Sequence, residues 1–479
     1  MSASASDQLT AAATTVINSN LPDVASGPGG NGGNGTNGNN GNNSAAGMPQ
    51  RVLTVKDAIF LTVGIVIGAG IFKAPSIVAS AAGSEGMMIL AWVLGGAITL
   101  IGALTYAELA STFPSAGGDY HFIHLAYGKR PAFLFAWARA TVITTGSIAL
   151  LSFVFGDYAS QIYSLGPHSP ALYACFVVLL LSGIHWISTR ASSTAQNWLT
   201  GLEVAGLVLV AIAGFAAPAA PIPAMVSEGG TSAAAFGFAM VMVLLTFGGW
   251  SEVAYVSSEL SADKRGIART LIASIAVVTV LYLIVNLAYL NALGLQGMAK
   301  SQAVAADVLK ATFGDWGGRL MSVIVMIATL TSINSTLIVG ARSSYAAGRD
   351  WPALRFLGAW SESGSTPRHA LIVQAGLALA LIAFGATQRD GFSAMVEYTS
   401  PVFWTFFLLA GMSIFVLRKK HPDVERPFRV PLYPVIPALF CIACAYLLYA
   451  SLVYVKTGAL FGAGLLAVGA VISLFLGKK

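Results

Sequence analysis

Runs of apolar residues, each about 20 residues long, recur from residue 56 to the C-terminus, and short polar segments separate them. About 20 apolar residues in a helix cross the hydrocarbon core of a bilayer. The runs are continuous and lack the ten-residue alternation of membrane barrel strands. The pattern therefore predicts twelve membrane-spanning helices, at about 56–82, 86–112, 131–160, 170–188, 194–216, 234–260, 267–293, 316–345, 369–386, 392–417, 432–453 and 457–476.

The composition strengthens this interpretation. Hydrophobic residues make up 56% of the chain and charged residues 10%, whereas soluble domains carry about 25% charged residues. In lipid, backbone polar groups are satisfied only in helices and closed barrels. We therefore expect an all-α integral membrane protein surrounded by membrane lipid.

The cysteines do not indicate a disulfide framework or a metal site. There are three, and Cys441 and Cys444 form a C-x-x-C inside the apolar run "FCIACAYLLYASLVY". No second Cys/His pair stands nearby to complete a zinc site. We expect no bound metal or organic cofactor, and small residues packed within a lipid-embedded helix.

The first 50 residues differ from the rest of the chain. They are rich in Ala, Ser and Thr and then read "GPGGNGGNGTNGNNGNNS". Such a segment cannot bury enough apolar surface to fold. It also lacks the basic stretch and apolar core of a signal peptide. We expect residues 1–50 to form a disordered cytoplasmic arm, and residues 51–479 to form the twelve-helix domain.

The basic residues indicate how the spans are oriented. With the N-terminus inside, nineteen of the 26 Lys and Arg residues fall in inner loops and tails, and six fall outside, namely Lys73, Lys300, Lys310, Arg319, Arg389 and Lys456. Basic residues concentrate on the cytoplasmic side of membrane proteins. The pattern predicts that both termini are cytoplasmic. The net charge of +6 is dispersed over separate loops, so no nucleic-acid partner is expected.

Glycines interrupt two of the apolar runs. The first run contains "VGIVIGAGIF", Val63 to Phe72, and the sixth reads "FAMVMVLLTFGGWSEVAYVSSEL", with Gly248 and Gly249 near its middle. Alone, Gly64-x-x-x-Gly68 is also typical of a helix-packing face. Interrupted segments at corresponding places in two halves, however, indicate a transporter binding site. The breaks lie five spans apart, so the halves would run in opposite directions.

An unwound backbone can recognise a small zwitterion. N–H groups at the start of one half-helix suit a carboxylate, and carbonyls at the end of the other suit an ammonium group. Glycine lets a ligand approach the backbone closely. An α-amino acid carries both groups on one carbon, although other small zwitterions or amines fit the same logic.

Several motifs, in order, resemble those of one known family. They are "GIVIGAGIF", "LTYAELASTFPSAGGDYHFI", "FGGWSEVAYVSSELSADKRGIARTL", "ARSSYAAGRDWPALRFLG" and "HPDVERPFRVPLYPVIPALF", and they span residues 52 to about 445. The chain resembles the amino acid–polyamine–organocation superfamily, near its amino-acid permease and L-type transporter branch. The resemblance implies a LeuT-like fold of 5+5 inverted repeats, at about 56–216 and 234–417, with extra helices at 432–476.

The resemblance also implies which residues bind substrate. The carboxylate would bind the N–H groups of Gly68, Ala69 and Gly70. The amino group would bind the carbonyls of Val66, Ile67, Leu245 and Gly248. The position of Leu245 often carries a gating aromatic in the family, so Phe247 or Trp250 is expected to occlude the substrate instead. Ser251 matches a position that often holds a polar pocket residue.

The fifth run departs from the family pattern. "QNWLTGLEVAGL" resembles Q-N-x-x-T-x-x-K, but Glu203 stands at the lysine position. Intramembrane carboxylates commonly mark ion or proton paths, so Glu203 is expected to bind a coupling cation, H+ or Na+. Satisfaction by the backbone or hydroxyls of the first helix is the alternative. Thr331, Ser332 and Ser335 of the eighth run are its expected partners, unless their hydroxyls bond their own i−4 carbonyls.

Other polar residues are expected to line the side-chain pocket or to form ion pairs. The side-chain pocket is expected to be lined from the third and tenth runs, by Thr144, Thr145, Ser147, Glu397, Tyr398 and Ser400. Glu108 is expected to pair with a basic residue of an inner loop, and Glu259 and Arg265 to form an inner gate.

These observations favour a secondary active transporter in the plasma membrane. The chain contains no G-x-x-x-x-G-K-[ST] loop for ATP, and no catalytic or metal constellation, so an enzyme is not expected. We expect a neutral L-amino acid to be moved by alternating access, through proton symport or exchange. A polyamine or cationic amino-acid transporter and a non-transporting sensor remain alternatives, and the oligomeric state is left open.

Overall fold

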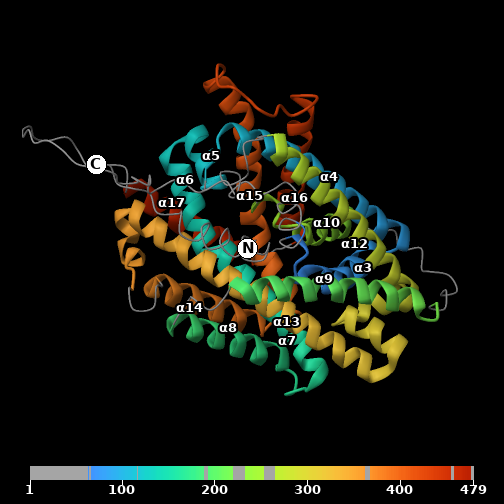
Figure 1. The fold of residues 1–479 in the computed structure, drawn as a ribbon. Coiled ribbons are helices and arrows are strands. Elements are labelled where there is room, and N and C mark those ends of the chain that lie inside the picture. The colour runs from blue at the N-terminus through green and yellow to red at the C-terminus, as the bar shows by residue number, and fades with distance from the viewer. Residues whose placement is uncertain are drawn as a thin grey trace, which may run out of the picture.

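The computed structural model describes residues 63, 66–115, 117–187, 193–219, 232–252, 265–361, 367–454 and 458–475. The expected N-terminal arm, residues 1–50, lies outside them. The described chain is almost wholly helical (Figure 1), with the elements η1 (Ala69–Phe72), α3 (Ala74–Ala82), α4 (Glu85–Thr112), α5 (Gly118–Tyr127), α6 (Lys129–Ala138), η2 (Arg139–Ile143), α7 (Thr144–Ile162), α8 (Ser169–Ile187), α9 (Ser193–Ala216), α10 (Ala233–Thr246), η3 (Trp250–Glu252), α12 (Arg265–Lys300), α13 (Val304–Asp350), η4 (Pro352–Gly358), α14 (Arg368–Gly385), α15 (Gly391–Lys420), α16 (Val435–Tyr454) and α17 (Gly458–Phe475).

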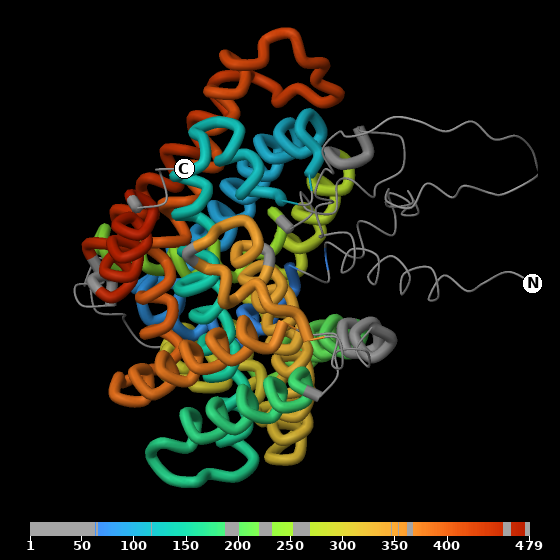
Figure 2. Tube along the Cα trace, turned by 90° about the vertical axis from the view of Figure 1, so that its left-hand side faces the viewer, coloured from blue at the N-terminus to red at the C-terminus, as the bar shows by residue number. Residues whose placement is uncertain are grey.

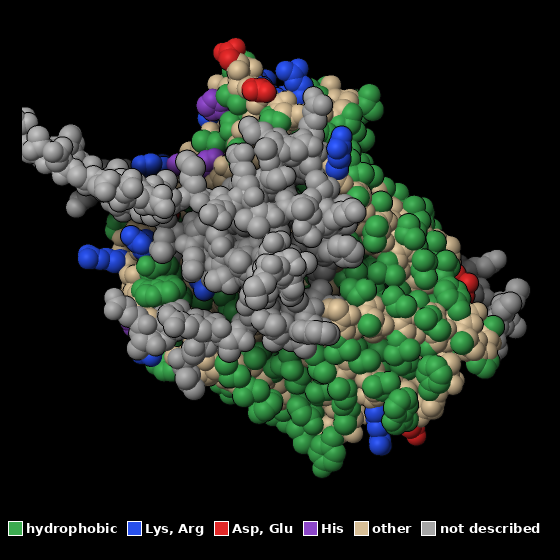
Figure 3. All heavy atoms as spheres, viewed as in Figure 1, with side chains coloured by type: hydrophobic (Ala, Val, Ile, Leu, Met, Phe, Trp, Pro, Cys, Tyr) green, Lys and Arg blue, Asp and Glu red, His purple; other side chains and the backbone are tan. Residues whose placement is uncertain are grey.

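Eight helices of the described chain are long and apolar enough to cross a membrane, and three further apolar helices are shorter. This confirms the expected all-α membrane protein. Hydrophobic side chains dominate much of the face shown in Figure 3, whereas charged side chains are few and lie near its margins. A surface of this kind is suited to lipid tails.

The helix ends follow the local sequence closely. Side chains of Ser84 and Ser232 accept hydrogen bonds from backbone N–H groups in the first turns of α4 and α10, as N-cap residues do. α12 and α13 continue beyond the expected spans, but each has a non-helical glycine, Gly294 and Gly314, where the expected spans end or begin. Hydropathy therefore located the membrane segments, and glycine marks where the helices bend.

Both glycine-rich runs are interrupted as expected. In the first run, extended backbone at Gly68 separates Val66 from the short helix η1, and α3 follows. In the sixth run, α10 ends at Thr246, and a turn with a positive φ of 95° at Gly249 precedes η3. A positive φ favours glycine because it has no Cβ.

The interrupted helices lie at the centre of the bundle. α3 packs against α10 and α12, and α10 also packs against α4. α13 packs along α7 and α9, while α8 and α14 lie side by side (Figures 1 and 2). The site is therefore enclosed by helices drawn from the whole length of the described chain.

Candidate functional site

The break in the first helix leaves a specific set of backbone groups for a ligand. The Gly68 N–H donates to the Val66 carbonyl at 2.8 Å. The next residues, Ala69 and Gly70, open η1, and the first N–H groups of a helix have no partner within it. Of the three N–H groups expected to hold a carboxylate, those of Ala69 and Gly70 therefore remain at a helix start.

Three buried tyrosines satisfy carbonyls that the same break releases. Tyr282 of α12 reaches the Val66 carbonyl at 2.9 Å and Tyr289 the Ile71 carbonyl at 3.4 Å. Tyr158 of α7 donates to the Phe72 carbonyl at 2.6 Å. Non-helical backbone at membrane depth persists only where such partners exist.

Tyr282 also joins the two breaks. Its hydroxyl lies 2.9 Å from the Val66 carbonyl and 3.2 Å from the Thr246 carbonyl. A hydroxyl has one hydrogen to donate, so it can serve only one of these carbonyls at a time. Tyr282 is absent from the sequence-based list of site residues, because a tyrosine in an apolar run carries no signal of its own.

Two of the four carbonyls expected to bind an ammonium group, those of Val66 and Leu245, already have partners. Val66 accepts from Gly68 and Tyr282, and Leu245 accepts from the Gly248 N–H at 3.0 Å. A carbonyl oxygen has two lone pairs, so a ligand would share or displace these bonds.

Several residues beside the two breaks are partly exposed. They are Gly68, Gly70, Leu245, Gly248 and Ser251. Among the described residues, a Cβ placed on Gly68 would meet no atom within 4 Å, whereas one on Gly70 would lie 3.4 Å from Thr246. Within the described part of the chain, the less crowded side is therefore that of Gly68, and Gly70 lets the two broken helices approach.

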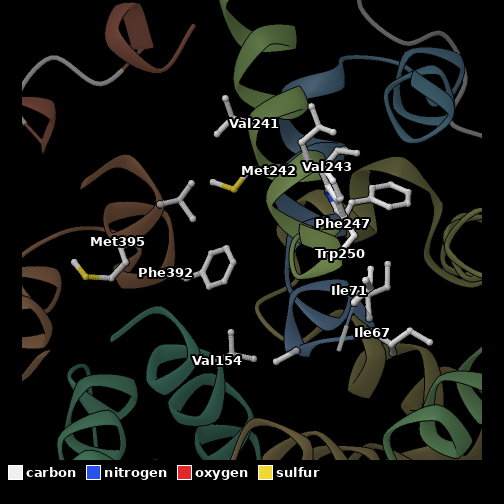
Figure 4. Packing of buried hydrophobic residues seen from close by; sticks show 14 of the residues in the cluster. Ile67, Ile71, Val154, Val241, Met242, Val243, Phe247, Trp250, Phe392 and Met395 are labelled. Atoms are coloured by element: carbon white, nitrogen blue, oxygen red, sulfur yellow. The ribbon is translucent and has the colours of Figure 1, made fainter. Parts of the chain in front are cut away.

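The two candidate occluding aromatics are packed among other rings. Phe247 is 0% exposed and lies against Trp92 and Tyr282. Trp250 is 4% exposed and lies against Tyr106 and Phe407. Figure 4 shows both as part of the buried hydrophobic cluster that also contains Ile67 and Ile71 of the first helix. Their role in occlusion stays a prediction.

A buried group of charges lies directly after the first broken helix. The Lys73 ammonium, directly after η1, lies 2.8 Å from Asp157 of α7 and 3.9 Å from Asp390 at the start of α15. It also donates to the carbonyl and the side-chain oxygen of Gln302, at 3.2 and 3.1 Å. Sequence reasoning counted Lys73 among the residues on the outer side and missed this group. The available signal was a basic and an acidic residue, Lys73 and Asp157, near the outer ends of two apolar runs.

Glu203 lies inside the protein, as a functional carboxylate would. It is 4% exposed, and within the described residues its Oε1 has no hydrogen-bond partner. Its helix, α9, packs against α12 and α13.

The three hydroxyls expected to face Glu203 bond their own helix instead. Thr331 donates to Ile327, Ser332 to Ala328 and Ser335 to Thr331, at 3.1, 3.3 and 3.0 Å. This is the alternative geometry considered for them. A hydroxyl that donates in this way keeps lone pairs with which to contact a cation.

The residues expected to line a side-chain pocket lie on α7 and α15. Tyr398 donates to the Thr141 carbonyl in η2 at 3.3 Å, and the Thr145, Ser147 and Ser400 hydroxyls bond carbonyls of their own helices. Thr144 is 8% exposed, and Glu397 is partly exposed. A π-helical turn such as η2 commonly occurs at functional sites.

The expected ion pair of Glu108 is confirmed. Arg418 donates to both carboxylate oxygens, at 2.8 and 2.6 Å, and the Val430 N–H donates at 2.7 Å. The pair ties α4 to α15 and to the segment that leads to α16. Glu259 and the side chain of Arg265, the expected inner gate, lie outside the described residues. The described part of the chain contains no group of His, Cys, Asp and Glu that could hold a metal ion.

Comparison with known proteins identifies the family. A family model for amino acid permeases matches residues 53–475. The chain therefore belongs to the amino acid permeases of the amino acid–polyamine–organocation superfamily. It is a multi-pass membrane protein of a transporter family and not an enzyme.

The chain is similar over most of its length to several curated transporters. It is 29% identical to the b(0,+)-type amino acid transporter 1 of Mus musculus, over 84% of this chain and 83% of the relative. It is 26% identical to the cystine/glutamate transporter of Homo sapiens, over 84% of this chain and 80% of the relative. It is 27% identical to the Asc-type amino acid transporter 1 of Mus musculus, over 84% and 77%.

Proposed function

We propose that the chain is a secondary active transporter that carries an amino acid across the plasma membrane by alternating access. The observation that carries this proposal is the pair of broken helices whose released carbonyls share one hydroxyl, that of Tyr282. The names of the similar transporters, all of which refer to amino acids or to cystine and glutamate, support the class of substrate.

The helix packing supports two inverted five-helix repeats. If a two-fold axis relates each helix of the first half to the helix five spans later, a contact between two helices implies a contact between their two symmetry mates. Four helices of the first half contact their own symmetry mates, namely α3 with α10, α4 with α12, α7 with α13 and α8 with α14. Three other contacts occur together with their symmetry-related contacts: α3–α12 with α10–α4, α9–α13 with α15–α7, and α8–α13 with α14–α7. Because each half has an odd number of spans, the halves run in opposite directions, with both termini cytoplasmic.

In this proposal the substrate binds in the space beside Gly68. Its carboxylate accepts from the N–H groups of Ala69 and Gly70, at the positive end of η1. Its ammonium donates to the carbonyls of Val66 and Leu245, and the Tyr282 hydroxyl then turns to the Thr246 carbonyl. The side chain is expected to be neutral, since the partly exposed Leu245 is aliphatic.

The buried charges at Lys73 support alternation. They bind the first helix to α7, to α15 and to the loop before α13, so the described arrangement is closed on that side. Outward opening would require the Lys73 ammonium to leave the Asp157 carboxylate.

We assign proton coupling to Glu203, in a mechanism of symport or exchange. A carboxylate that is 4% exposed and whose Oε1 has no partner among the described residues is costly to keep charged. A proton or a cation relieves this cost. Sodium symport is the alternative that the lone pairs of Thr331, Ser332 and Ser335 favour.

Uptake of labelled amino acids into proteoliposomes tests the proposal. We expect accumulation of at least one neutral amino acid, driven by an inward proton gradient or by amino acid preloaded inside. Binding without uptake under either condition would show a sensor. A thermal-shift screen of the twenty amino acids and of polyamines identifies the ligand, because stabilisation rises with ligand concentration over Kd. Stabilisation by polyamines alone would overturn the substrate class.

A further inference from the structure

Two carboxylates share the Lys73 ammonium. Its nitrogen lies 2.8 Å from Asp157 Oδ2 and 3.9 Å from Asp390 Oδ1. An ammonium has three hydrogens, and it donates to the carbonyl and the side-chain oxygen of Gln302, so the remaining hydrogen can serve only one carboxylate at a time. With both carboxylates ionised, the group holds one positive and two negative charges. One negative charge is therefore left uncompensated.

The deeper of the two carboxylates has an oxygen that no hydrogen bond satisfies. The Asp157 side chain is 9% exposed. Its Oδ2 is buried and receives no aligned hydrogen bond from a described residue, although the Lys73 ammonium lies within ion-pair distance. Asp390 accepts from the N–H and the hydroxyl of Ser393 and is 29% exposed. The uncompensated charge is therefore most costly at Asp157, where neither water nor a donor stabilises it.

The titratable groups around these carboxylates do not supply the missing positive charge. Those that interact with Asp390 or with the neighbouring Tyr158 are acids and a tyrosine, namely Glu397, Asp307 and Tyr289. The basic residues Lys300 and Arg389 stand close by in the sequence, but they are exposed, and within the described part of the chain neither forms an ion pair with the group. A bound cation would neutralise the group, and the smallest that Oδ2 can accept is a proton.

We propose that Asp157 binds one proton when the first helix closes against α7. The proton comes from water on the side where Lys73 lies, an O–H bond forms at Oδ2, and the group becomes neutral. In an open arrangement the same carboxylate meets water, which stabilises its charge, so it binds the proton less tightly. By linkage, acid therefore favours the closed arrangement. Carboxylates within membrane segments commonly serve in proton relays.

This proton site is separate from Glu203 and has a different role. The proposed orientation puts Lys73 on the outer side, and alternating access gives the closure its place in transport, so the role rests on the proposed function. The proton returns to the same side when that side opens again. Asp157 would therefore make outer closure sensitive to the outside pH, without adding to the proton coupling assigned to Glu203.

Thermal denaturation of the detergent-solubilised protein tests whether the proton binds. In the unfolded chain an aspartate takes up its proton near pH 4, whereas the closed group would take it up at higher pH. The wild type should therefore become more stable as the pH falls from about 8 to about 6. Asp157→Asn and Asp390→Asn each leave one positive and one negative charge. Each variant should lose this gain and should exceed the wild type in stability at the higher pH.

Asp315→Asn is the matched control, because the Asp315 carboxylate also lies beside a lysine, 2.9 Å from Lys310 Nζ, but is 76% exposed. It should keep the wild-type gain. A gain that persists in both Asp157→Asn and Asp390→Asn would overturn the proposal. If Glu203→Gln removes the gain and Asp157→Asn does not, the proton binds at Glu203. If sodium chloride at the higher pH stabilises the wild type as much as acid does, and choline chloride does not, the ligand is a metal cation.

Labelling of Val154→Cys tests the link to closure. Val154 is 0% exposed and lies about one turn before Asp157 on α7 (Figure 4). A membrane-impermeant maleimide should reach it only when the first helix leaves α7. Its rate is divided by that of the exposed Lys310→Cys at the same pH, after subtraction of labelling at the three native cysteines.

We expect this relative rate to fall with the pH, by at most about tenfold per unit for one proton. With Asp157→Asn it should be low throughout. A rate that does not depend on pH with Asp157 present, or that depends on it equally with Asp157→Asn, would overturn the proposal. Neither measurement needs uptake, so a protein that fails to transport but shows both effects would contradict only the proposed function.

Discussion

The Lys73 ammonium lies 2.8 Å from the Asp157 carboxylate, and the two side chains are 2% and 9% exposed. The pair joins the end of the first broken helix to α7. The next residue of α7, Tyr158, holds the Phe72 carbonyl and accepts from the Ala305 N–H at 3.3 Å. Two consecutive residues of α7 therefore bind two consecutive residues of the first helix. Any opening on this side must break this double contact.

Replacing Lys73 by Met is expected to destabilise the protein strongly. The change leaves Asp157 and Asp390 without their ammonium, and removing one partner of a buried ion pair costs about 3–5 kcal/mol. Thermal denaturation of the detergent-solubilised protein measures the loss. The double variant Lys73→Met with Asp157→Asn should regain part of it, because no carboxylate then remains unpaired at Asp157.

The exposed pair of Lys310 and Asp315 is the control for this prediction. Its atoms are 2.9 Å apart, but the side chains are 61% and 76% exposed. Exposed ion pairs contribute little to stability, so Lys310→Met should leave the denaturation temperature unchanged. If both lysine variants behave alike, burial of the Lys73 pair does not constrain the first helix.

The sequence predicted features that depend on local composition. The helices α4, α8 and α15 begin and end within a few residues of the expected spans, because apolar length alone defines them. Both breaks fall at glycines, because glycine weakens a helix wherever it occurs. The sequence predicted that Glu108 pairs with a basic residue, because an acidic residue at the end of a span needs a positively charged partner.

Features that depend on distant partners could not be predicted. Tyr282 is 216 residues from Val66, and Lys73 is 229 residues from Gln302. A tyrosine in an apolar run is equally suited to packing, to a membrane interface or to capping a released carbonyl. Only the folded structure shows which of these roles Tyr282 has. It also shows that the Gly68 N–H donates to the Val66 carbonyl.

Replacing Tyr282 by Phe is expected to weaken substrate binding. The variant keeps the buried ring, which packs against Trp92 and Phe247, but it removes the hydroxyl that the Val66 and Thr246 carbonyls share. The Val66 carbonyl keeps the Gly68 N–H, but the Thr246 carbonyl loses its hydroxyl donor. Leaving a buried carbonyl unpaired costs about 1–3 kcal/mol, and the geometry of the broken helices should relax. We expect KM for uptake to rise about tenfold.

Tyr173→Phe serves as the control for this variant. The Tyr173 hydroxyl donates to the Tyr163 carbonyl at 3.0 Å in an exposed position, so its removal should leave KM unchanged. An unchanged KM in Tyr282→Phe would show that the bridge between the two breaks does not shape the binding site.

Replacing Gly68 by Ala is expected to weaken amino-acid binding without destabilising the fold. The backbone at Gly68 is extended, with φ −98° and ψ 179°, and any residue adopts it. A Cβ there meets no atom of the described residues within 4 Å, so the protein should fold with unchanged or slightly higher stability. The added methyl would occupy the proposed ligand space, and amino-acid affinity should fall at least about tenfold.

Gly376→Ala is the matched control, because an added Cβ on Gly376 of α14 also meets no atom of the described residues within 4 Å. It should preserve both stability and affinity. If Gly68→Ala binds the amino acid as tightly as Gly376→Ala does, the ligand does not approach the backbone at Gly68.

Replacing Glu203 by Gln is expected to abolish coupling while preserving exchange. Glutamine has nearly the same shape but cannot bind and release a proton, so the variant is fixed in a neutral form. Uptake driven by an inward proton gradient should fall to the rate seen without a gradient, whereas uptake into vesicles preloaded with amino acid should persist. Glu425→Gln, which removes an exposed carboxylate in the segment after α15, should respond to the gradient as the wild type does. The measurement is repeated with a sodium gradient in place of the proton gradient. If Glu203→Gln responds to both gradients as the wild type does, the buried carboxylate serves only the packing of α9.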